Sequence, residues 1–278
     1  MREFGGFYKE VGGAEGTHCS YPTRFDVYGC GCEHNCNYCY ARSLLDFRGL
    51  WHPDNPSVAD LKKVIKKLDE ISSGTVLRMG GMTDCFQPIE EELGIAYETI
   101  KAMNARDIHY LIVTKSNLIS SDKYLAVLDK KLAHIQVTVT TADEKTAREV
   151  FGECAPAPEL RIRAIETLYE AGFDVAMRVS PFVPELACIE RLNQVNVDKC
   201  IVEFLRVNSW IEKWLPIDLK AYRHKEGGYR HLPRHEKAKS IKLLDFPQLS
   251  VCEDCDSHYE WWQAFQNPNP KDCCNLRI

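Results

Sequence analysis

Four cysteines fall within the short stretch CGCEHNCNYCYAR, which runs from Cys30 to Arg42. Three of them, Cys32, Cys36 and Cys39, have the spacing C-x3-C-x2-C. Thiolates are soft ligands that suit zinc and iron–sulfur clusters. Three thiolates can hold three irons of a [4Fe–4S] cluster and leave the fourth iron open to a small molecule. The alternatives are a structural zinc site, which needs four ligands and would add Cys30, and buried structural thiols without a metal.

The bulk composition limits where such chemistry takes place. The 278 residues suit one large domain or two small ones, and no apolar run approaches the roughly 20 residues of a membrane span. The beginning, MREFGGFYKE, lacks the apolar core of a signal peptide. We therefore expect a cytoplasmic protein whose 13 cysteines serve metal or redox chemistry rather than disulfides. The net charge of −5 gives no overall attraction for nucleic acid.

The cysteine stretch closely resembles the cluster-binding loop of the radical S-adenosylmethionine (SAM) superfamily, including the aromatic Tyr38 just before the last cysteine. The resemblance implies that Cys32, Cys36 and Cys39 bind a [4Fe–4S] cluster and that SAM chelates the open iron through its amino and carboxylate groups. Reductive cleavage of SAM then gives a 5′-deoxyadenosyl radical, with the electron coming from a donor such as flavodoxin or ferredoxin. Tyr38 would pack near the adenine.

Strand-like and helix-like segments alternate after this loop, which indicates a parallel α/β sheet. The six expected strands are residues 24–29, 75–81, 108–116, 134–140, 174–184 and 200–207, and the expected helices are 57–72 with Ser57 as cap, 90–105, 122–132, 159–172 and 188–194. This count matches a partial (β/α)6 TIM-like barrel of the radical SAM type. We expect a single domain with a core of about residues 20–210 and a C-terminal extension, residues 211–278, that caps the barrel mouth.

Polar residues follow the ends of several expected strands, where active residues of barrels gather. Any one of them could be a structural hydrogen-bonding group, but together they favour a lined pocket. The candidate cofactor-binding residues are Tyr38, Tyr40, Thr83, Lys115, Ser116, Thr138, Thr140 and Arg178. The candidate substrate-binding residues are Arg42, Asp84, Glu203, Arg206, Asn208 and Glu253.

Three segments, YPTRFDVYGCGCEHNCNYCYAR, VTKS and GFDVAMRVSPFVP, together resemble the spore photoproduct lyase-like branch over about residues 20–210. The resemblance implies that Lys115 binds the SAM carboxylate, with Thr138 nearby and Thr140 towards the ribose. Photoproduct lyases carry a cysteine hydrogen donor before a Thr-Ser-Asp-like triplet, where this chain has Gly81. Cys85 lies four residues on and is either a displaced catalytic donor or a small core residue.

The chain is also similar to the compact queuine lyases of this branch, which release the base queuine from queuosine or its 5′-phosphate. This resemblance makes queuine release the preferred function, and the length and the missing donor cysteine are compatible with it. It implies a small modified nucleoside or nucleotide as substrate and no membrane or extended nucleic acid as partner. Queuine carries a basic amine, for which Asp84 or Glu253 would be a partner, and Asp84 is a second catalytic candidate. Repair of a DNA photoproduct is the first alternative, and a non-catalytic zinc-binding module is the second.

The last third of the chain has two further features. Between Lys220 and Lys242 lie eight basic and two acidic residues with three interleaved histidines, which suits either a phosphate site or a solvated surface. Beyond this stretch lie four more cysteines, which either bind a second metal or belong to a tail folded over the barrel: Cys252, Cys255, Cys273 and Cys274.

Overall fold

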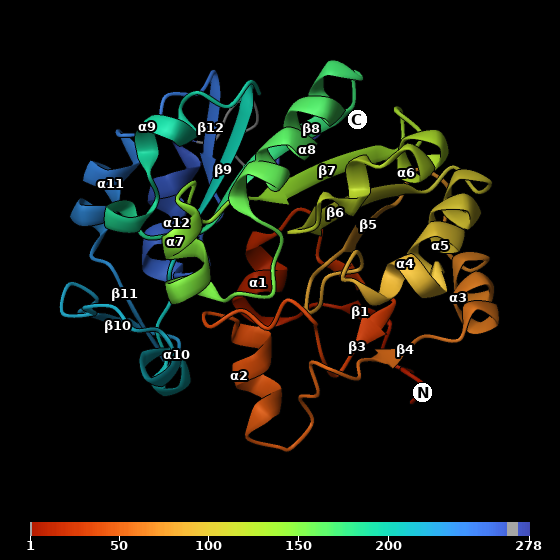
Figure 1. Cartoon of the computed structure of the whole chain (residues 1–278), viewed down its shortest axis with the longest axis horizontal. Coiled ribbons are helices and arrows are strands. Elements are labelled where there is room, and N and C mark those ends of the chain that lie inside the picture. Colours follow the sequence, from red (N-terminus) through yellow and green to blue (C-terminus); the bar gives the residue numbers. More distant parts are fainter. Residues whose placement is uncertain (1, 266–271) are drawn as a thin grey trace.

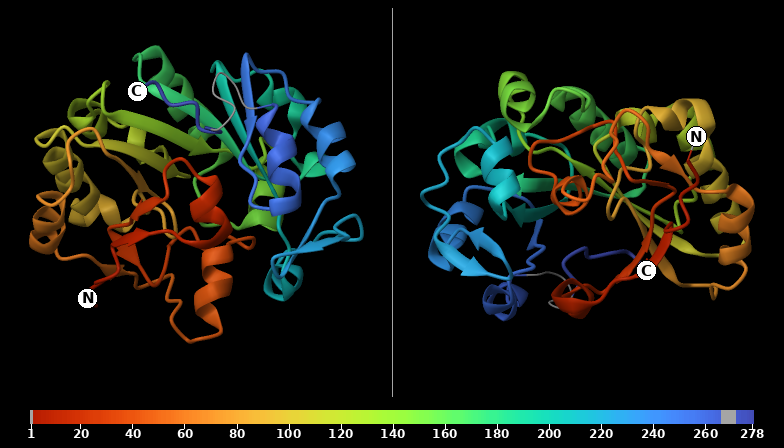
Figure 2. Two further views of the ribbon diagram at one scale, coloured as in Figure 1. Left: turned by 180° about the vertical axis from the view of Figure 1, so that it is seen from behind. Right: turned by 90° about the horizontal axis from the view of Figure 1, so that it is seen from below.

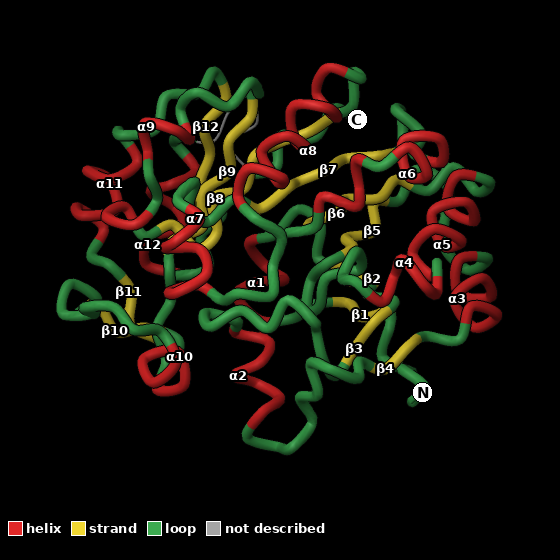
Figure 3. The backbone as a smooth tube through the Cα atoms, in the orientation of Figure 1, coloured by secondary structure: helices red, strands yellow, loops and turns green. Residues whose placement is uncertain are grey.

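An eight-stranded sheet forms the centre of the protein, in a computed structural model that describes residues 2–265 and 272–278. All neighbouring strands are parallel except the first pair, and the strands lie side by side in Figures 1 and 3. Their order across the sheet is β1 (Tyr8–Glu10), β2 (Thr23–Phe25), β5 (Val76–Met79), β6 (His109–Thr114), β7 (Ala133–Thr138), β8 (Asp174–Phe182), β9 (Lys199–Phe204) and β12 (Gln248–Val251).

The predicted fold class is confirmed, because the six expected strands are β2 and β5 to β9 in consecutive order. Two edge strands were not predicted. At one edge β1 runs antiparallel to β2, and at the other edge β12 runs parallel to β9. The C-terminal extension therefore contributes a strand to the sheet in addition to the elements that follow the barrel.

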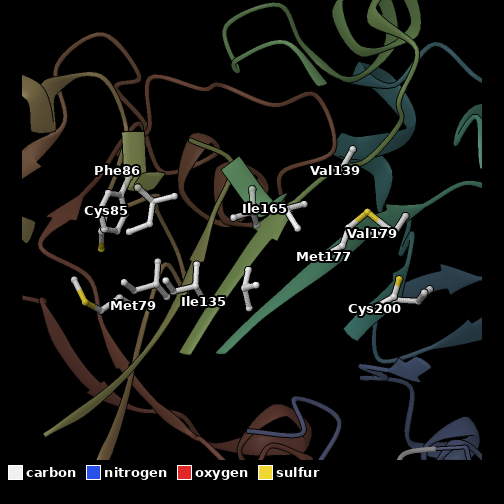
Figure 4. Close-up of a cluster of buried hydrophobic side chains, with 14 of the residues drawn as sticks. Met79, Cys85, Phe86, Ile135, Val139, Ile165, Met177, Val179 and Cys200 are labelled. Atoms are coloured by element: carbon white, nitrogen blue, oxygen red, sulfur yellow. The ribbon is translucent and has the colours of Figure 1, made fainter. Parts of the chain in front are cut away.

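Helices follow the strands and pack on the sheet through apolar residues at helical spacing. In α8, for example, Ile162, Ile165 and Leu168 are fully buried. Figure 4 shows Ile165 in the same cluster as Ile135 of β7 and Met177 of β8. The helices that connect the parallel strands are α3 (Leu61–Leu68), α4 (Ile89–Leu93), α5 (Ile95–Asn104), α6 (Asp122–Val127), α7 (Glu144–Thr146), α8 (Pro158–Glu170) and α9 (Ile189–Leu192).

Two expected helices differ from the prediction for local reasons. The helix expected from Ser57 begins only at Leu61, because Asp60 accepts hydrogen bonds from two backbone N–H groups of its first turn and acts as the cap. Ser57 instead belongs to β4 (Ser57–Val58), which pairs with β3 (Tyr28–Gly29). The helix expected over 90–105 is divided into α4 and α5, because Gly94 adopts φ +64° and ends the first helix.

The extension is attached to both edges of the barrel core. It contains α10 (Ser209–Trp214), the hairpin β10 (His224–Glu226) with β11 (Tyr229–His231), α11 (Arg234–Ile241), β12 and α12 (Asp256–Gln263). The ring of Tyr259 in α12 stacks on His18 of α1 (Gly13–His18) at 3.7 Å between centroids, and its hydroxyl donates to the His18 carbonyl. The N-terminal and C-terminal segments thus meet, as the two views of Figure 2 show. Within the described residues, no helix is long and apolar enough to cross a membrane.

Candidate active site

Cys32, Cys36 and Cys39 line one cavity at the C-terminal ends of β5 to β9. They lie between β3 and α2 (Tyr40–Asp46), in a loop held against the segment after α7. Asn37 of this loop donates through its backbone to the Phe151 carbonyl at 3.0 Å and through its side chain to the Val150 carbonyl at 2.9 Å. These contacts fix the loop over the ends of the strands.

This donor set fits a cluster held by three cysteines. Burial raises the pKa of Cys32 and of Cys39, so negatively charged thiolates need a strong positive partner here. Cys30, the fourth ligand that a structural zinc site would need, is not among the described residues that line the cavity. Cys39 also caps α2, since its sulfur accepts from the Arg42 N–H at 3.4 Å.

Tyr38 and Lys115 face each other across the same cavity. The Lys115 ammonium lies 5.4 Å from the centroid of the Tyr38 ring, and Thr138 lines the wall beside them. Although burial disfavours a charge on Lys115, the neighbouring Tyr38, Cys36 and Asp84 raise the pKa of its ammonium, which therefore stays protonated. A protonated lysine beside an aromatic ring suits an anionic group next to a flat base.

The segment GGMTD after β5 is shaped by a buried carboxylate that the sequence analysis did not single out. Asp26 accepts the N–H groups of Gly80 and Gly81 at 2.8 Å and that of Met82 at 2.9 Å. Gly80 has φ +90°, and a Cβ there would lie 2.0 Å from the Val113 carbonyl oxygen. Asp26 lies within the expected strand 24–29. The sequence shows there only an acidic residue among apolar ones, and nothing marks it as an acceptor for the GGMTD backbone.

The Asp84 carboxylate is held by structural hydrogen bonds and is not free to bind a substrate, contrary to the prediction from the sequence. Its carboxylate accepts from Thr114 Oγ1 at 2.7 Å, from the Lys115 N–H at 2.7 Å and from the Phe86 N–H at 2.9 Å, and it lies 3.3 Å from His34 Nε2. Burial opposes its charge, but His34 and these N–H groups lower the pKa of Asp84 below its usual value. Asp84 lines the cavity, and its hydrogen bonds orient Lys115.

A second cavity adjoins the first and holds a network of charged side chains. Glu203 Oε2 accepts from Arg178 at 2.7 Å and from Ser180 at 2.8 Å, and Arg206 pairs with Asp254 of the extension. In spite of burial, Arg178 and Arg206 lower the pKa of Glu203 to about 2. Both arginines and both carboxylates line this cavity, which the extension closes on one side.

Tyr40 is one of several residues that line both cavities. Its hydroxyl donates to the Gly81 carbonyl, and the Arg206 guanidinium lies 4.4 Å from its ring centroid. Thr83 also lines the first cavity, with its hydroxyl bonded to the Tyr28 carbonyl.

Several candidate site residues have other contacts and do not line either cavity. Ser116 caps the 3-10 helix Asn117–Ser120, and Thr140 bonds Tyr38 at 3.2 Å and the Ser180 carbonyl at 3.1 Å, so it supports the wall from behind. Arg42 stacks on Trp214 at 4.0 Å, and Asn208 caps α10. The substrate contacts predicted for Arg42 and Asn208 are therefore corrected to packing and capping.

Cys85 and Glu253 also differ from their predicted roles. Cys85 is 1% exposed and lies in the main core beside Met79 and Phe86, as Figure 4 shows, so it does not reach the cavity as a hydrogen donor must. Glu253 lines the second cavity, but its carboxylate accepts from Lys237 and from Trp262 Nε1 at 2.9 Å. Both bonds tie Glu253 to the extension rather than leaving it for a substrate amine.

The structure divides the four late cysteines into two groups. Cys252, Cys273 and Cys274 line the second cavity together with Cys19, whereas Cys255 does not and begins α12. Of the two alternatives for these cysteines, this division favours a tail folded over the barrel rather than one metal site with four cysteine ligands. The hydrogen bond from Cys273 and the nearby Arg178 lower the pKa of Cys252 to about 7 against the effect of burial.

The basic stretch between Lys220 and Lys242 does not reach the cavities among the described residues. Arg230 pairs with Glu212 at 2.6 Å, Arg223 lies 3.8 Å from Glu236, and Lys237 pairs with Glu253. The exposed pair of Arg223 favours a solvated surface for part of the stretch, whereas Lys237 is fully buried and has a structural role. The lysine and arginine side chains that line the two cavities, among the described residues, are instead Arg78, Lys115, Arg178 and Arg206.

Comparisons with known proteins agree with this geometry. The family model described as the radical SAM superfamily matches residues 27–185. An uncharacterized protein of Methanocaldococcus jannaschii is 30% identical over 237 residues, which cover 80% of this chain and 87% of that relative. Among solved structures, a tyrosine-to-phenylalanine variant of spore photoproduct lyase has a TM-score of 0.64 at 16% identity, covering 90% of this chain and 80% of that one. A variant with bound AdoMet and dinucleoside spore photoproduct has a TM-score of 0.60 at 17% identity, covering 81% and 73%.

Proposed function

The chain belongs to the radical SAM superfamily, and from this premise we propose that it is a lyase that releases queuine from queuosine 5′-phosphate or queuosine. Enzymes of this superfamily use a [4Fe–4S] cluster and SAM. When bound, the cluster supplies the electron that cleaves SAM to a 5′-deoxyadenosyl radical. The observation that carries the proposal is that the three-cysteine cavity continues directly into a second, charged cavity closed by the extension.

We assign the cluster to Cys32, Cys36 and Cys39 and the SAM site to the walls around them. Lys115 is positioned to bind the SAM carboxylate, because Asp84 holds its backbone and Tyr38 borders its ammonium. Tyr38 and Thr138 line the part of the cavity that would hold the adenosine, with Thr140 fixing the Tyr38 hydroxyl. The Thr83 and Tyr40 hydroxyls hold the chain around Gly81 by bonding to backbone carbonyls.

The second cavity is the proposed substrate site. Its carboxylates Glu203 and Asp254 are partners for a basic amine, and its guanidinium groups on Arg178 and Arg206 are partners for a phosphate. A nucleotide that carries an amine needs both kinds of partner, a negative group for the amine and a positive group for the phosphate. Asp254 replaces Asp84 and Glu253 as the proposed amine partner. Both carboxylate oxygens of Asp84 and of Glu253 accept structural hydrogen bonds, whereas Asp254 pairs with Arg206 through Oδ2.

The closed second cavity favours a nucleoside or nucleotide over a DNA duplex. Residues 252–254 of the extension line one side of it, and three of the basic residues in the nearby stretch, Arg223, Arg230 and Lys237, are paired with carboxylates. We propose that the electron donor is a flavodoxin or ferredoxin. Its docking surface cannot be identified from the described residues.

Photoproduct repair is the second candidate function, and the shared fold with spore photoproduct lyase favours it. That reaction would need a thiol hydrogen donor at the substrate. Cys85 is buried in the core, so the candidate donor becomes Cys252, whose thiol lines the second cavity.

An anaerobic turnover assay tests the proposal. Reconstituted protein, SAM and dithionite are mixed separately with queuosine 5′-phosphate, queuosine and ultraviolet-damaged oligonucleotide, and 5′-deoxyadenosine and free base are followed by mass spectrometry. We expect queuine release that is lost in Cys36→Ala and kept in Cys154→Ala, which changes an exposed cysteine. Conversion of damaged DNA alone, lost in Cys252→Ala, would support repair. SAM cleavage without conversion of any substrate would refute the substrate assignment.

A further inference from the structure

Two histidines of the β10–β11 hairpin and two residues of the first turn of α12 converge in the extension. The ligand atoms of His224, Cys255 and His258 all lie within 4.8 Å of one another, and those of His231, Glu253 and Cys255 do the same. We propose that this cluster binds one zinc ion through His224, His231, Cys255 and His258. The assignment does not depend on the proposed function.

The backbone explains why these four side chains meet. His224 and His231 are direct cross-strand partners in the hairpin register, so their side chains stand on the same face. Cys255 is the N-cap residue of α12 and His258 lies three residues on, in the first turn, so both lie at the N-terminal end of this helix. A hairpin that supplies two ligands and a helix that supplies two more is an arrangement suited to tetrahedral zinc.

In each hairpin histidine, the hydrogen bonds that the structure shows are made by Nε2. His224 Nε2 lies 3.1 Å from Glu226 Oε2 and 3.1 Å from Ser257 Oγ, and His231 Nε2 lies 3.3 Å from the Glu226 carbonyl. Because Glu226 offers only acceptors to these nitrogens, each Nε2 carries the hydrogen and each Nδ1 carries the lone pair. A carboxylate or carbonyl that orients a histidine in this way is typical of zinc ligands.

The remaining two side chains are buried. Cys255 is 1% exposed and His258 is 4% exposed. His258 Nδ1 has no hydrogen-bond partner within residues 2–265 and 272–278. Unpartnered buried ring nitrogens are unfavourable, and a metal ion at the centre of the cluster would satisfy this one.

Glu253 is excluded from the ligand set by its other contacts. The fully buried Lys237 ammonium and Trp262 Nε1 both donate to its Oε2, and the Cys255 N–H donates to its Oε1 at 3.1 Å. The Lys237–Glu253 pair is neutral overall, so it leaves one thiolate and three neutral imidazoles for the metal. That donor set favours zinc over magnesium or calcium, which prefer oxygen ligands.

Metal analysis of the full-length protein, purified anaerobically without a polyhistidine tag, tests this assignment. We expect about one tightly bound zinc per chain, as for a structural site. The zinc content should fall below about one tenth per chain in Cys255→Ser and in His258→Gln. The matched controls Cys154→Ser and His235→Gln, at exposed positions, should keep the zinc. Cys36→Ala should also keep it, which separates this site from zinc misplaced in the cluster loop.

Measurements on the unaltered protein keep the test decisive if a variant does not fold. X-ray absorption at the zinc edge should show one sulfur and three nitrogen ligands. Cobalt added to the zinc-free protein should give a thiolate-to-metal charge-transfer band. A wild type that binds no zinc when given one equivalent, a zinc shell of three or four sulfurs, or unchanged zinc in a folded Cys255→Ser protein would each overturn the assignment.

Discussion

Gly80 lies where β5 ends and the chain turns along the wall of the first cavity, and its replacement by alanine provides a quantitative test of the structure. Gly80 has φ +90°, and a Cβ would lie 2.0 Å from the Val113 carbonyl oxygen, which belongs to the neighbouring strand β6. Gly74 is a matched control, because it has φ +77° and a Cβ added there would meet nothing within 4 Å. The two substitutions therefore share the backbone strain and differ in the steric clash.

The magnitudes follow from those two components. A left-handed backbone costs an alanine about 1–2 kcal/mol, which is the expected loss in the free energy of unfolding for Gly74→Ala. Gly80→Ala adds overpacking against a backbone atom, typically about 1–3 kcal/mol or more, so we expect a total of about 2–5 kcal/mol. The clash also pushes β5 and β6 apart beside Lys115, and we expect at least tenfold weaker SAM binding, about 1.4 kcal/mol.

Two assays separate these effects. Urea unfolding of the anaerobic protein, followed by tryptophan fluorescence, gives the free energies of unfolding, and equilibrium dialysis with labelled SAM gives the affinities. If Gly80→Ala destabilises the protein no more than Gly74→Ala and binds SAM as tightly, the close approach of β5 to β6 described above is wrong.

Three further predictions concern single charged groups. Alkylation of Cys252 in cluster-free protein should have a midpoint near pH 7, and Cys273→Ala should raise this midpoint, because Cys273 donates the hydrogen bond that lowers the pKa. The pKa of Cys252 in the folded protein, about 7, lies below the ordinary thiol value of 9.0, so the free energy of unfolding of the wild type should rise from pH 7 to pH 9. A flat profile equal to that of Cys252→Ala would contradict this prediction. Lys115→Met should weaken SAM binding about 10–100-fold, because it removes a charged partner of the ligand. The control Lys123→Met, which does not line the cavity, should leave SAM binding unchanged. Equal SAM affinities of the two variants in equilibrium dialysis would show that Lys115 is not part of the SAM site. Lys237→Met should cost about 3–5 kcal/mol in urea unfolding because it leaves Glu253 buried without a charge partner, and Lys237→Met/Glu253→Gln should recover part of that loss; an unchanged single variant would show that the pair is not buried.

The sequence predicted those features that depend on local pattern. Alternating strands and helices identified the six barrel strands, and the spacing of Cys32, Cys36 and Cys39 identified a metal-binding loop. The helix end at Gly172 was predicted, whereas the break at Gly94 inside the expected helix 90–105 and the cap at Asp60 were missed. In each case the deciding interaction lies within a few residues.

Features that depend on contacts between distant segments could not be predicted. Asp26 receives three N–H groups from residues more than fifty positions away, and no local spacing marks it. Cys252 and Cys255 read as one C-x2-C pair, but the end of β12 and the start of α12 send their side chains to different sites. The polar residues at strand ends correctly indicated where the cavity lies. Which of these side chains line the cavity depends on packing, which the sequence does not show.

The joining of β12 to β9 has a consequence for how the enzyme is assembled. The cysteine loop is synthesised early, whereas Gln248–Val251 form the late strand β12 and residues 252–254 line the second cavity. Lys199 at the start of β9 bonds the Asn275 carbonyl, and the Arg277 N–H donates to Asp174, so this wall is secured only after residue 277 has been made. The cluster loop is therefore made long before the wall of the second cavity, and this cavity stays open on the β9 side until the last residues of the chain are in place.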